Sequence, residues 1–414
     1  MGRPHCPSKR PGGLELSRGS ETYERETNER TTGSPPPTTM TSLSLFVRLF
    51  AFMALLASAC HGASIHTNKL LRGRAPTAAA AAAAPQTVDR SDGASYMRTT
   101  QYRSEDDIVG VYESIEGDDL VLRVAASDDA GVSWYPMGFV LSVKNSEYSI
   151  GNPHILALED GRLLCAHRNH RWDPNIKDRF ATFGIGIHQS WDGGKSWQEL
   201  SRPDDRIRTG VDGIWEPFLR ISPTSDKLQV FWSNEMTTWD QDIVYQESDN
   251  YGETWSAPVT VAGADRTARD GMPSVVNVES QAFTVFESGT GPLFVVDIVS
   301  SNDDNMKGWG DRHRIYTPKG DNLQAGAPWV INVGGILVVS FMTNEDTRDL
   351  PNVDGGELKI VWSTDRGVTW SSPITVGQRG SHWPGMMALN DTDFLVTWSQ
   401  DGSGMLSQKF RFGY

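Results

Sequence analysis

Short apolar runs recur along the chain beyond Tyr96, separated by polar turns. Five of them carry a proline in second position: "NPHILAL" (152–158), "EPFLRIS" (216–222), "MPSVVNV" (272–278), "APWVINV" (327–333) and "WPGMMAL" (383–389). Each is followed by a turn and another apolar run, as in "FTVFES". Runs of this length between turn residues predict β-strands. Proline lacks an N–H group, so we expect it at the first residue of each strand.

A second pattern, S-x-D-x-G-x-[ST]-W, occurs at 127–134, 190–197, 248–255 and 363–370, with Asn250 replacing the acid in the third copy. The acid positions are 63, 58 and 115 residues apart, and the last gap is about twice the others. A degraded copy is therefore expected in "SSNDDNMKGW" (300–309). Such a period predicts a repeat architecture. Asp, Ser and Gly at these positions predict a hairpin turn in each copy.

Together the two patterns define a unit of four antiparallel strands, with the repeated turn between the third and the fourth. The first unit, around "SYMRTTQY" and "DIVGVYES", lacks the proline. The predicted fold class is all-β: a six-bladed β-propeller with four-stranded antiparallel blades, forming one catalytic domain over 86–414. We expect its sixth blade to take its last strand from residues just after Pro85.

The residues before this domain differ in composition. Residues 1–39 are polar and rich in Pro, Ser and Thr, which predicts a disordered or over-extended start. Met40, Arg48, the apolar stretch 49–59 and the following small residues predict a signal peptide over 40–63. Residues 64–85 include an alanine tract and are interpreted as a linker. The predicted product is a secreted, extracellular protein without a membrane anchor once the signal is removed.

Charge and cysteine content narrow the function classes. The formal net charge is −14, from 38 Lys/Arg and 52 Asp/Glu, and residues 1–84 hold ten of the basic and five of the acidic residues. The domain is therefore strongly acidic, which disfavours binding to nucleic acid or anionic lipid. Beyond the predicted signal only Cys165 remains, so we expect no internal disulfide and a buried thiol. We expect a monomer.

Alternating strand directions place the starts of the first strands and the ends of the second strands on one face, opposite the repeated turns. The first strand is innermost in a propeller, so its opening residues ring an axial channel. Glu216 in "GIWEPFL" and Glu287 in "AFTVFES" interrupt apolar patterns at this rim. Glycosidic cleavage needs two such carboxylates, and burial of Glu287 against its apolar strand would raise its pKa, as suits a general acid.

The same rim collects side chains suited to binding sugar hydroxyls and rings. They are Asn152, Arg168, Asn169, His170, Trp215, Arg269, Asp270, Glu345, Asp346 and Trp383. No His, Cys or carboxylate cluster has the spacing of a metal site, so neither a metal nor another cofactor is expected.

Stretches such as "GIWEPFLRIS", "RDGMPSVVNV", "FTVFES" and "SHWPGMMALNDTDFLV" resemble the exo-arabinanases of glycoside hydrolase family 93. The repeated turn is similar to the Asp-box of sialidase-like propellers. The resemblance implies a secreted six-bladed propeller that releases arabinobiose from the non-reducing end of α-1,5-linked L-arabinan, with retention. It implies Glu216 as nucleophile and Glu287 as acid/base, and a polysaccharide substrate as the partner.

Two other functions stay open. A sialidase would need an arginine cluster and a tyrosine nucleophile, for which Arg98, Arg168 and Arg269 with Tyr96 or Tyr112 are available. A non-catalytic sugar-binding propeller would keep the fold without turnover.

Overall fold

The apolar runs of the sequence form antiparallel strands that pair mainly with their neighbours along the chain. The computed structural model describes residues 78–91, 93–210, 213–289, 291, 293–302 and 308–413, and within these ranges it contains strands and turns but no helix. Accordingly, no helix that could cross a membrane occurs in the described part. The predicted extension (1–39), the predicted signal (40–63) and most of the expected degraded turn (303–307) lie outside the described residues.

Three sheets contain four consecutive strands each. The first comprises β3 (Ser95–Gln101), β4 (Ile108–Glu116), β5 (Asp119–Ser127) and β6 (Tyr135–Lys144). The second comprises β7 (Tyr148–Ala157), β8 (Leu163–Trp172), β9 (Phe180–Ser190) and β10 (Gln198–Ile207). The third comprises β19 (Ala325–Val333), β20 (Ile336–Thr343), β21 (Glu357–Ser363) and β22 (Ile374–Gly377).

An eight-stranded sheet joins two further sets of four strands. One set is β11 (Ile214–Ile221), β12 (Leu228–Thr237), β13 (Asp240–Ser248) and β14 (Val259–Ala262). The other is β15 (Arg269–Val278), β16 (Gln281–Gly289), β17 (Phe294–Ser301) and β18 (Gly310–Tyr316). A single parallel bridge, Gln241 with Arg269, connects the sets. The described residues therefore form five hydrogen-bonded sheets, which does not confirm the expected six blades.

The last sheet closes the chain on itself. It contains β23 (Ser381–Ala388), β24 (Asp393–Gln400), β25 (Gly404–Gly413), and the N-terminal strands β1 (Ala78–Ala81) and β2 (Gln86–Asp89). Both N-terminal strands pair antiparallel with β25, so the strand expected just after Pro85 is present. The alanine tract, interpreted as a linker from its composition, contributes β1 to this sheet, and Ala79 is buried there.

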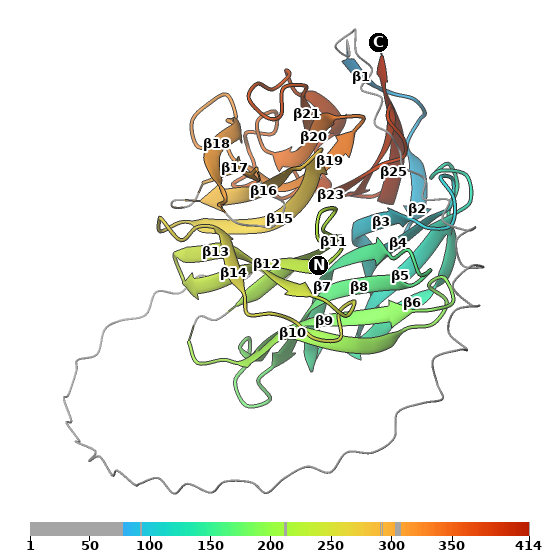
Figure 1. The fold of residues 1–414 in the computed structure, drawn as a ribbon, viewed down its shortest axis with the longest axis vertical. Coiled ribbons are helices and arrows are strands. Elements are labelled where there is room, and N and C mark those ends of the chain that lie inside the picture. The colour runs from blue at the N-terminus through green and yellow to red at the C-terminus, as the bar shows by residue number, and fades with distance from the viewer. Residues whose placement is uncertain are drawn as a thin grey trace, which may run out of the picture. The chain divides into compact units, whose positions relative to one another are not determined.

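The first strands of these sets contact one another in a closed cycle: β3, β7, β11, β15, β19, β23 and back to β3. Figure 1 shows the sheets arranged around a centre in chain order, with these strands innermost. This is the arrangement of a β-propeller, in which the innermost strands surround an axis. The closure brings residues that are far apart in sequence to one axial site.

The repeated turn has the same hydrogen bonds in all four copies. In the copy at 190–197, Gly194 N donates to Ser190 Oγ at 2.8 Å and Ser196 N donates to Asp192 Oδ1 at 2.9 Å. The other copies repeat both bonds, and Asn250 Oδ1 replaces the carboxylate as acceptor for Thr254 N. The turns join the third and fourth strands of their sets, as predicted.

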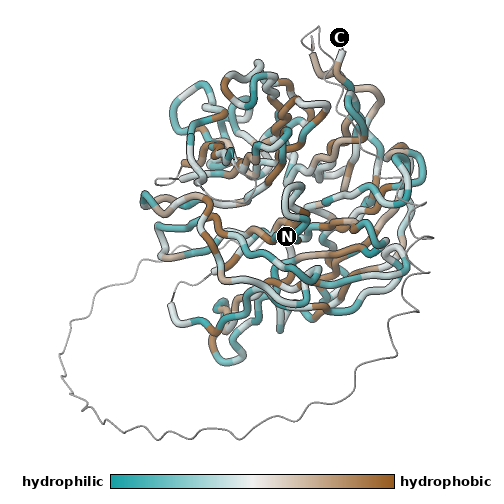
Figure 2. Tube along the Cα trace, in the orientation of Figure 1, coloured by the Kyte–Doolittle hydropathy of each residue, from teal (hydrophilic) through white to brown (hydrophobic). Residues whose placement is uncertain are grey.

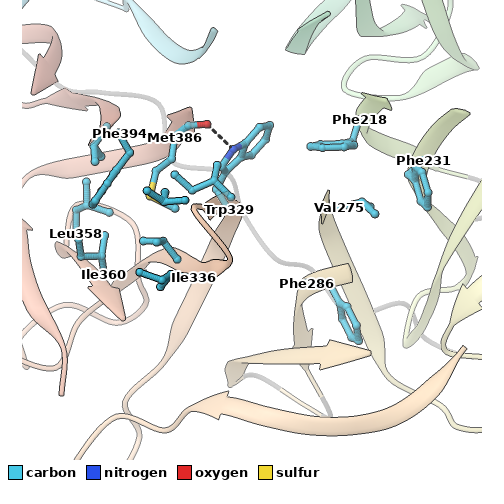
Figure 3. Close-up of a cluster of buried hydrophobic side chains, with 14 of the residues drawn as sticks. Phe218, Phe231, Val275, Phe286, Trp329, Ile336, Leu358, Ile360, Met386 and Phe394 are labelled. Carbon is cyan, nitrogen blue, oxygen red and sulfur yellow. Dashed lines mark hydrogen bonds between the residues drawn. The ribbon is translucent and has the colours of Figure 1, made fainter. Parts of the chain in front are cut away.

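The core lies between neighbouring sheets. Apolar residues gather in the strands and polar residues in the loops (Figure 2). One cluster includes Phe218, Phe231, Phe286, Trp329 and Phe394, and Figure 3 shows the Trp329 indole donating to the carbonyl of Met386, at 2.9 Å. Burying each such side chain contributes about 1.5–3 kcal/mol. Cys165 is fully buried, as expected.

Candidate active site

A backbone bulge recurs near the start of every innermost strand. Its central residue has a positive φ between 49° and 60° and stands at a register shift against the second strand. A non-glycine residue in this conformation costs about 1–3 kcal/mol, and bulges re-aim side chains. The bulged residues are Tyr96, Asn152, Glu216, Met272, Ala327 and Trp383.

The bulge corrects the expectation for the prolines. Each proline stands three to five residues inside its strand, directly after the bulged residue. A bulge tolerates proline because the ladder is already interrupted there. The proline therefore marks the bulge rather than the strand's first residue.

The bulges surround a narrow cavity of about 10 Å³ lined by Tyr96, Arg98, Glu216, Met272, Trp329 and four of the prolines. Arg98 fills the centre, with its guanidinium 4.0 Å from the Tyr96 ring centroid and 4.3 Å from that of Trp329. It donates to the carbonyls of Met97 and Trp383, at 3.0 and 3.3 Å. Arg98 therefore occupies the space between the rings of Tyr96 and Trp329.

Glu216 stands at the bulge of β11 and is half-buried, and hydrogen bonds hold one of its two carboxylate oxygens. Its Oε2 accepts hydrogen bonds from Ser233 Oγ at 2.8 Å and Met272 N at 3.4 Å. Among the described residues, none donates to Oε1. Burial raises the pKa of Glu216, although the Ser233 hydrogen bond and the charge of Arg168 oppose the change.

Glu287 lies on β16, directly across the ladder from Gly271, which precedes Met272. The two glutamates thus flank one peptide unit, and the charge of Glu216 acts on Glu287. Glu287 Oε2 accepts from Ala327 N at 2.8 Å, and Oε1 has no donor in the described part of the chain. Burial, assisted by Glu216, raises the pKa of Glu287 to about 7, which confirms the predicted direction.

A third glutamate, which the sequence analysis missed, has the same surroundings. Glu113 lies on β4 opposite Ser95, the residue before the first bulge. Its Oε1 accepts from Asn152 N at 2.5 Å, and burial raises its pKa while Arg168 opposes the change. The signal was present: "VYES" (111–114) and "VFES" (285–288) are the same strand end in two repeats.

Arg168 and Asn152 lie beside Glu113. A Cβ atom on Gly151 would be 2.8 Å from Glu113 Oε1 and 2.9 Å from Arg168 Nη2, so only glycine permits this approach. Arg168 donates to Ser149 Oγ at 3.2 Å and lies 5.6 Å from the Trp215 ring centroid.

His170 is a packing residue at the edge of this group, beside the half-buried Trp215. The ring of His170 is fully buried, 2.7 Å from the Ile214 carbonyl through Nε2, and packs against Trp215 and Phe180. Burial, followed by the charge of Arg168, lowers the pKa of His170 to about 3, so this ring stays neutral. Its position excludes the direct sugar contact predicted for it.

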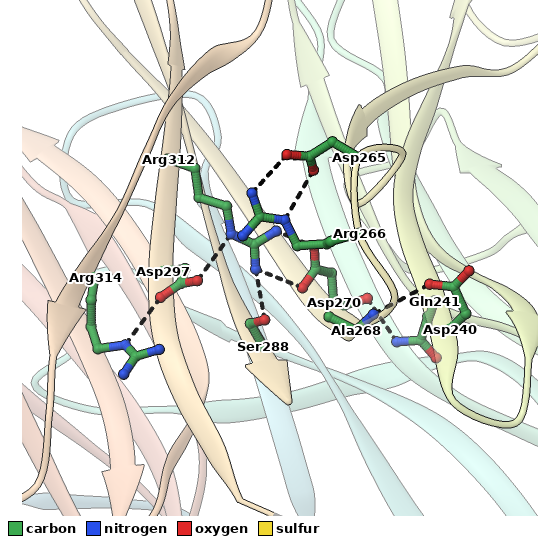
Figure 4. A network of polar contacts seen from close by, with 10 residues as sticks. All are labelled: Asp240, Gln241, Asp265, Arg266, Ala268, Asp270, Ser288, Asp297, Arg312 and Arg314. Carbon is green, nitrogen blue, oxygen red and sulfur yellow. Dashed lines mark hydrogen bonds and ion pairs between the residues drawn. The ribbon is translucent and has the colours of Figure 1, made fainter. Parts of the chain in front are cut away.

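Asp270 belongs to a polar network with residues of β13, β16, β17 and β18 (Figure 4), and Arg269 joins it through Gln241. Arg269 bonds Glu235 and Gln241, at 2.8 and 2.9 Å. Asp270 is fully buried, and both of its oxygens accept from Arg312, at 2.6 and 2.9 Å. Arg269 thus remains near the mouth, half-buried, whereas Asp270 supports the strand from beneath rather than facing a ligand.

Glu345 and Asp346 form a separate network. Glu345 is buried and accepts from the Tyr316 hydroxyl, from Lys359 Nζ at 2.9 Å and from Lys319 N at 2.8 Å. Burial alone would raise the pKa of Glu345, but these hydrogen bonds outweigh it and hold the pKa below its ordinary value. Asp346 is exposed and pairs with Lys359 at 2.8 Å. Lys359 thus pairs with both residues.

The remaining predicted residues are Trp383 and Asn169. Trp383 is a bulged residue whose ring lies 6.0 Å from that of Tyr96. Asn169 is half-buried on β8, next to Arg168.

Several buried polar atoms at this mouth have no hydrogen-bond partner within the described residues. They are Asn152 Oδ1, Arg168 Nε, His170 Nδ1, Trp215 Nε1 and Asn234 Oδ1. Unpaired buried polar atoms are rare in folded proteins, and such a group can bind hydroxyls of a ligand. In the described part of the chain, no group of three or more His, Cys, Asp or Glu residues is arranged to hold a metal ion.

Solved structures of similar fold are known. The α-L-arabinanase of Penicillium chrysogenum, complexed with arabinobiose, matches with a TM-score of 0.60 and 19% identity over 77% of this chain and 93% of that chain. The α-L-arabinofuranosidase of Fusarium graminearum, from glycoside hydrolase family 93 and also complexed with arabinobiose, gives 0.60 and 20% over the same shares. The chain has the fold of these proteins.

A sialidase is more distant. A mutant of NanB sialidase from Streptococcus pneumoniae gives a TM-score of 0.52 and 12% identity over 79% of this chain and 70% of that chain. No model of a known protein family matches the chain. No curated protein matches it either.

Proposed function

We propose that the protein is a secreted, retaining glycoside hydrolase that releases arabinobiose from the non-reducing end of α-1,5-L-arabinan. The observation that carries the proposal is the pair Glu216 and Glu287, which flank one peptide unit at the mouth of a propeller. Within the part of the chain that the structure describes, each has one oxygen fixed by hydrogen bonds and one without a donor. The two arabinobiose-bound structures of the same fold support arabinan as substrate.

The proposal includes six blades. The eight-stranded sheet then counts as two blades joined by the Gln241–Arg269 bridge, and each blade contributes one bulged residue to the mouth. Secretion rests on the predicted signal at 40–63.

The two glutamates take different roles. With its pKa raised to about 7, Glu287 holds a proton at mildly acidic pH and delivers it to the leaving oxygen as the general acid. Ser233 and Met272 hold Glu216 through one oxygen, so its other oxygen attacks the anomeric carbon as nucleophile. After departure of the leaving group, Glu287 activates the water that hydrolyses the glycosyl–enzyme. The retaining course of the proposal requires the two carboxyl groups to lie about 5–5.5 Å apart.

Asn152, Arg168, Asn169, Trp215, Arg269 and Trp383 are the substrate contacts of the proposal. Arg168 and Arg269 also act electrostatically on Glu216, which favours its ionised form.

The sialidase alternative has less support. Tyr96 is buried, and burial raises its pKa, which disfavours the phenolate that a tyrosine nucleophile requires. A fluorogenic sialoside assay separates the two, and we expect no turnover.

The test replaces each glutamate with glutamine. Glu216→Gln and Glu287→Gln should each lower turnover on linear arabinan by several orders of magnitude, because the first removes the nucleophile and the second removes the acid/base of both steps. Glu279→Gln, in an exposed ion pair with Arg366, is the matched control and should leave turnover unchanged. Near wild-type rates in either catalytic variant remove that residue from the mechanism. Binding of arabino-oligosaccharide without product favours the non-catalytic alternative.

A further inference from the structure

Glu113 and Glu287 occupy equivalent positions in two repeats. Each lies directly opposite the residue that precedes a bulge, Ser95 for Glu113 and Gly271 for Glu287. Each also accepts the backbone N–H of the bulged residue in the next strand set, Asn152 for Glu113 and Ala327 for Glu287. The propeller thus builds the same carboxylate site twice.

The bonding of the carboxylate oxygens separates Glu113 from the other rim glutamates. Glu235 is bonded through both oxygens, to Arg269 and to Gly213 N, and Glu345 is bonded likewise through both. Within the described residues, Glu113 accepts a hydrogen bond only through Oε1, and Glu287 only through Oε2. A half-buried carboxylate oxygen without a donor is costly unless it meets water or a ligand hydroxyl.

The order of strands around the axis places Glu113 relative to the reaction. In the contact cycle β3 and β15 are opposite each other, and Glu113 and Glu287 stand on the strands that follow them, β4 and β16. Glu216, on β11, lies between these two sides. Glu113 bonds Asn152 of β7, Glu216 bonds Met272 of β15 and Glu287 bonds Ala327 of β19, so Glu113 lies on the flank of Glu216 away from Glu287.

We propose that Glu113 binds hydroxyls of the sugar that Glu216 attacks; this rests on the proposed function. The general acid stands beside the leaving oxygen, so the attacked sugar extends from its anomeric carbon away from Glu287, toward Glu113. There Glu113 Oε2 accepts hydrogen bonds from hydroxyls, beside Asn152 and Arg168, each of which has a buried polar atom with no partner among the described residues. Glu113 takes no part in proton transfer. The ligand class is a neutral sugar with adjacent hydroxyls on its glycone side.

The test measures arabinobiose binding by calorimetry in the inactive E287Q background. A hydrogen bond to a charged group is worth about 1.5–3 kcal/mol, so E113Q/E287Q should bind at least about tenfold more weakly than E287Q. E279Q/E287Q, altered on the face opposite the mouth, is the matched control and should bind as E287Q does. Circular dichroism and thermal unfolding establish that each variant is folded.

Each outcome supports or overturns the role proposed for Glu113. Equal affinity of E113Q/E287Q and E287Q overturns the role of Glu113 while leaving the proposed function intact. Absence of arabinobiose binding to folded E287Q overturns both. If Glu113→Gln does not fold, Glu113→Asp keeps the charge beside Arg168 but withdraws the oxygens by about 1.5 Å. It should also weaken binding at least about tenfold, and unchanged affinity in that variant overturns the role.

Discussion

Replacing the proposed acid should stabilise the folded protein at alkaline pH. Burial raises the pKa of Glu287 from its ordinary 4.5 to about 7. Each tenfold change in proton affinity is worth about 1.4 kcal/mol, so holding this carboxyl ionised in the folded state costs up to about 3 kcal/mol. Because the pKa of Glu287 is higher in the folded state than in the unfolded state, its contribution to the free energy of unfolding is fully present below pH 4.5. It is lost as the pH rises through 7.

Glu287→Gln cannot ionise, yet its side-chain oxygen can still accept the N–H of Ala327. We therefore expect E287Q to be more stable than the wild type at pH 8, by up to about 3 kcal/mol, and nearly equal at pH 4.5. Guanidinium unfolding at the two pH values measures the difference.

Glu345→Gln is the control of opposite sign. Hydrogen bonds lower the pKa of Glu345, and its removal leaves the buried Lys359 with only Asp346, so E345Q should lose stability at pH 8. If E287Q proves no more stable than the wild type at pH 8, or gains equally at both pH values, then Glu287 is not desolvated as described.

Three further outcomes are expected. The pH profile of kcat/KM on arabinan should be bell-shaped, with a basic limb near pH 7 from Glu287 and an acidic limb above pH 4.5 from Glu216. A flat profile from pH 6 to 9 would contradict this assignment. Gly326→Ala places a Cβ 2.6 Å from Glu287 Oε2, so it should displace this carboxylate and lower kcat about a hundredfold. Gly310→Ala, with open space around the new methyl group, should leave kcat unchanged. Equal kcat values for the two variants would contradict this expectation. Arg312→Ala leaves the buried Asp270 carboxylate without its partner and should cost about 3–5 kcal/mol in thermal or denaturant unfolding; a loss below 1 kcal/mol contradicts that pairing.

Most of the fold could be predicted because its causes are local and repeated. The turn at 190–197 contains the side chains that form its own hydrogen bonds. The fixed period at which this turn recurs predicts the neighbouring sets of strands. The place of Pro217 was harder to predict, since proline suits both a strand start and a bulge, and only the register of β11 against β12 distinguishes them. The alanine tract looked like a linker because its strand forms by pairing with β25, far along the chain.

The sequence predicted that carboxylates would lie at the candidate site, but it did not predict which carboxylates belong to it. Strand direction alone brought Glu216 and Glu287 to the same rim as Glu345 and Asp270. Whether a rim carboxylate is free depends on partners that come from other strands, such as Arg312 for Asp270, 42 residues later in the sequence. Comparing the ends of equivalent strands across the repeats would have found Glu113.

The most direct test of the account is product analysis on debranched arabinan with the secreted protein. Mass spectrometry and NMR of the first-formed product identify its length and anomeric configuration. The account predicts arabinobiose, released with the α-configuration of the cleaved bond retained. Release of the β-anomer first, or no product on prolonged incubation, would contradict it.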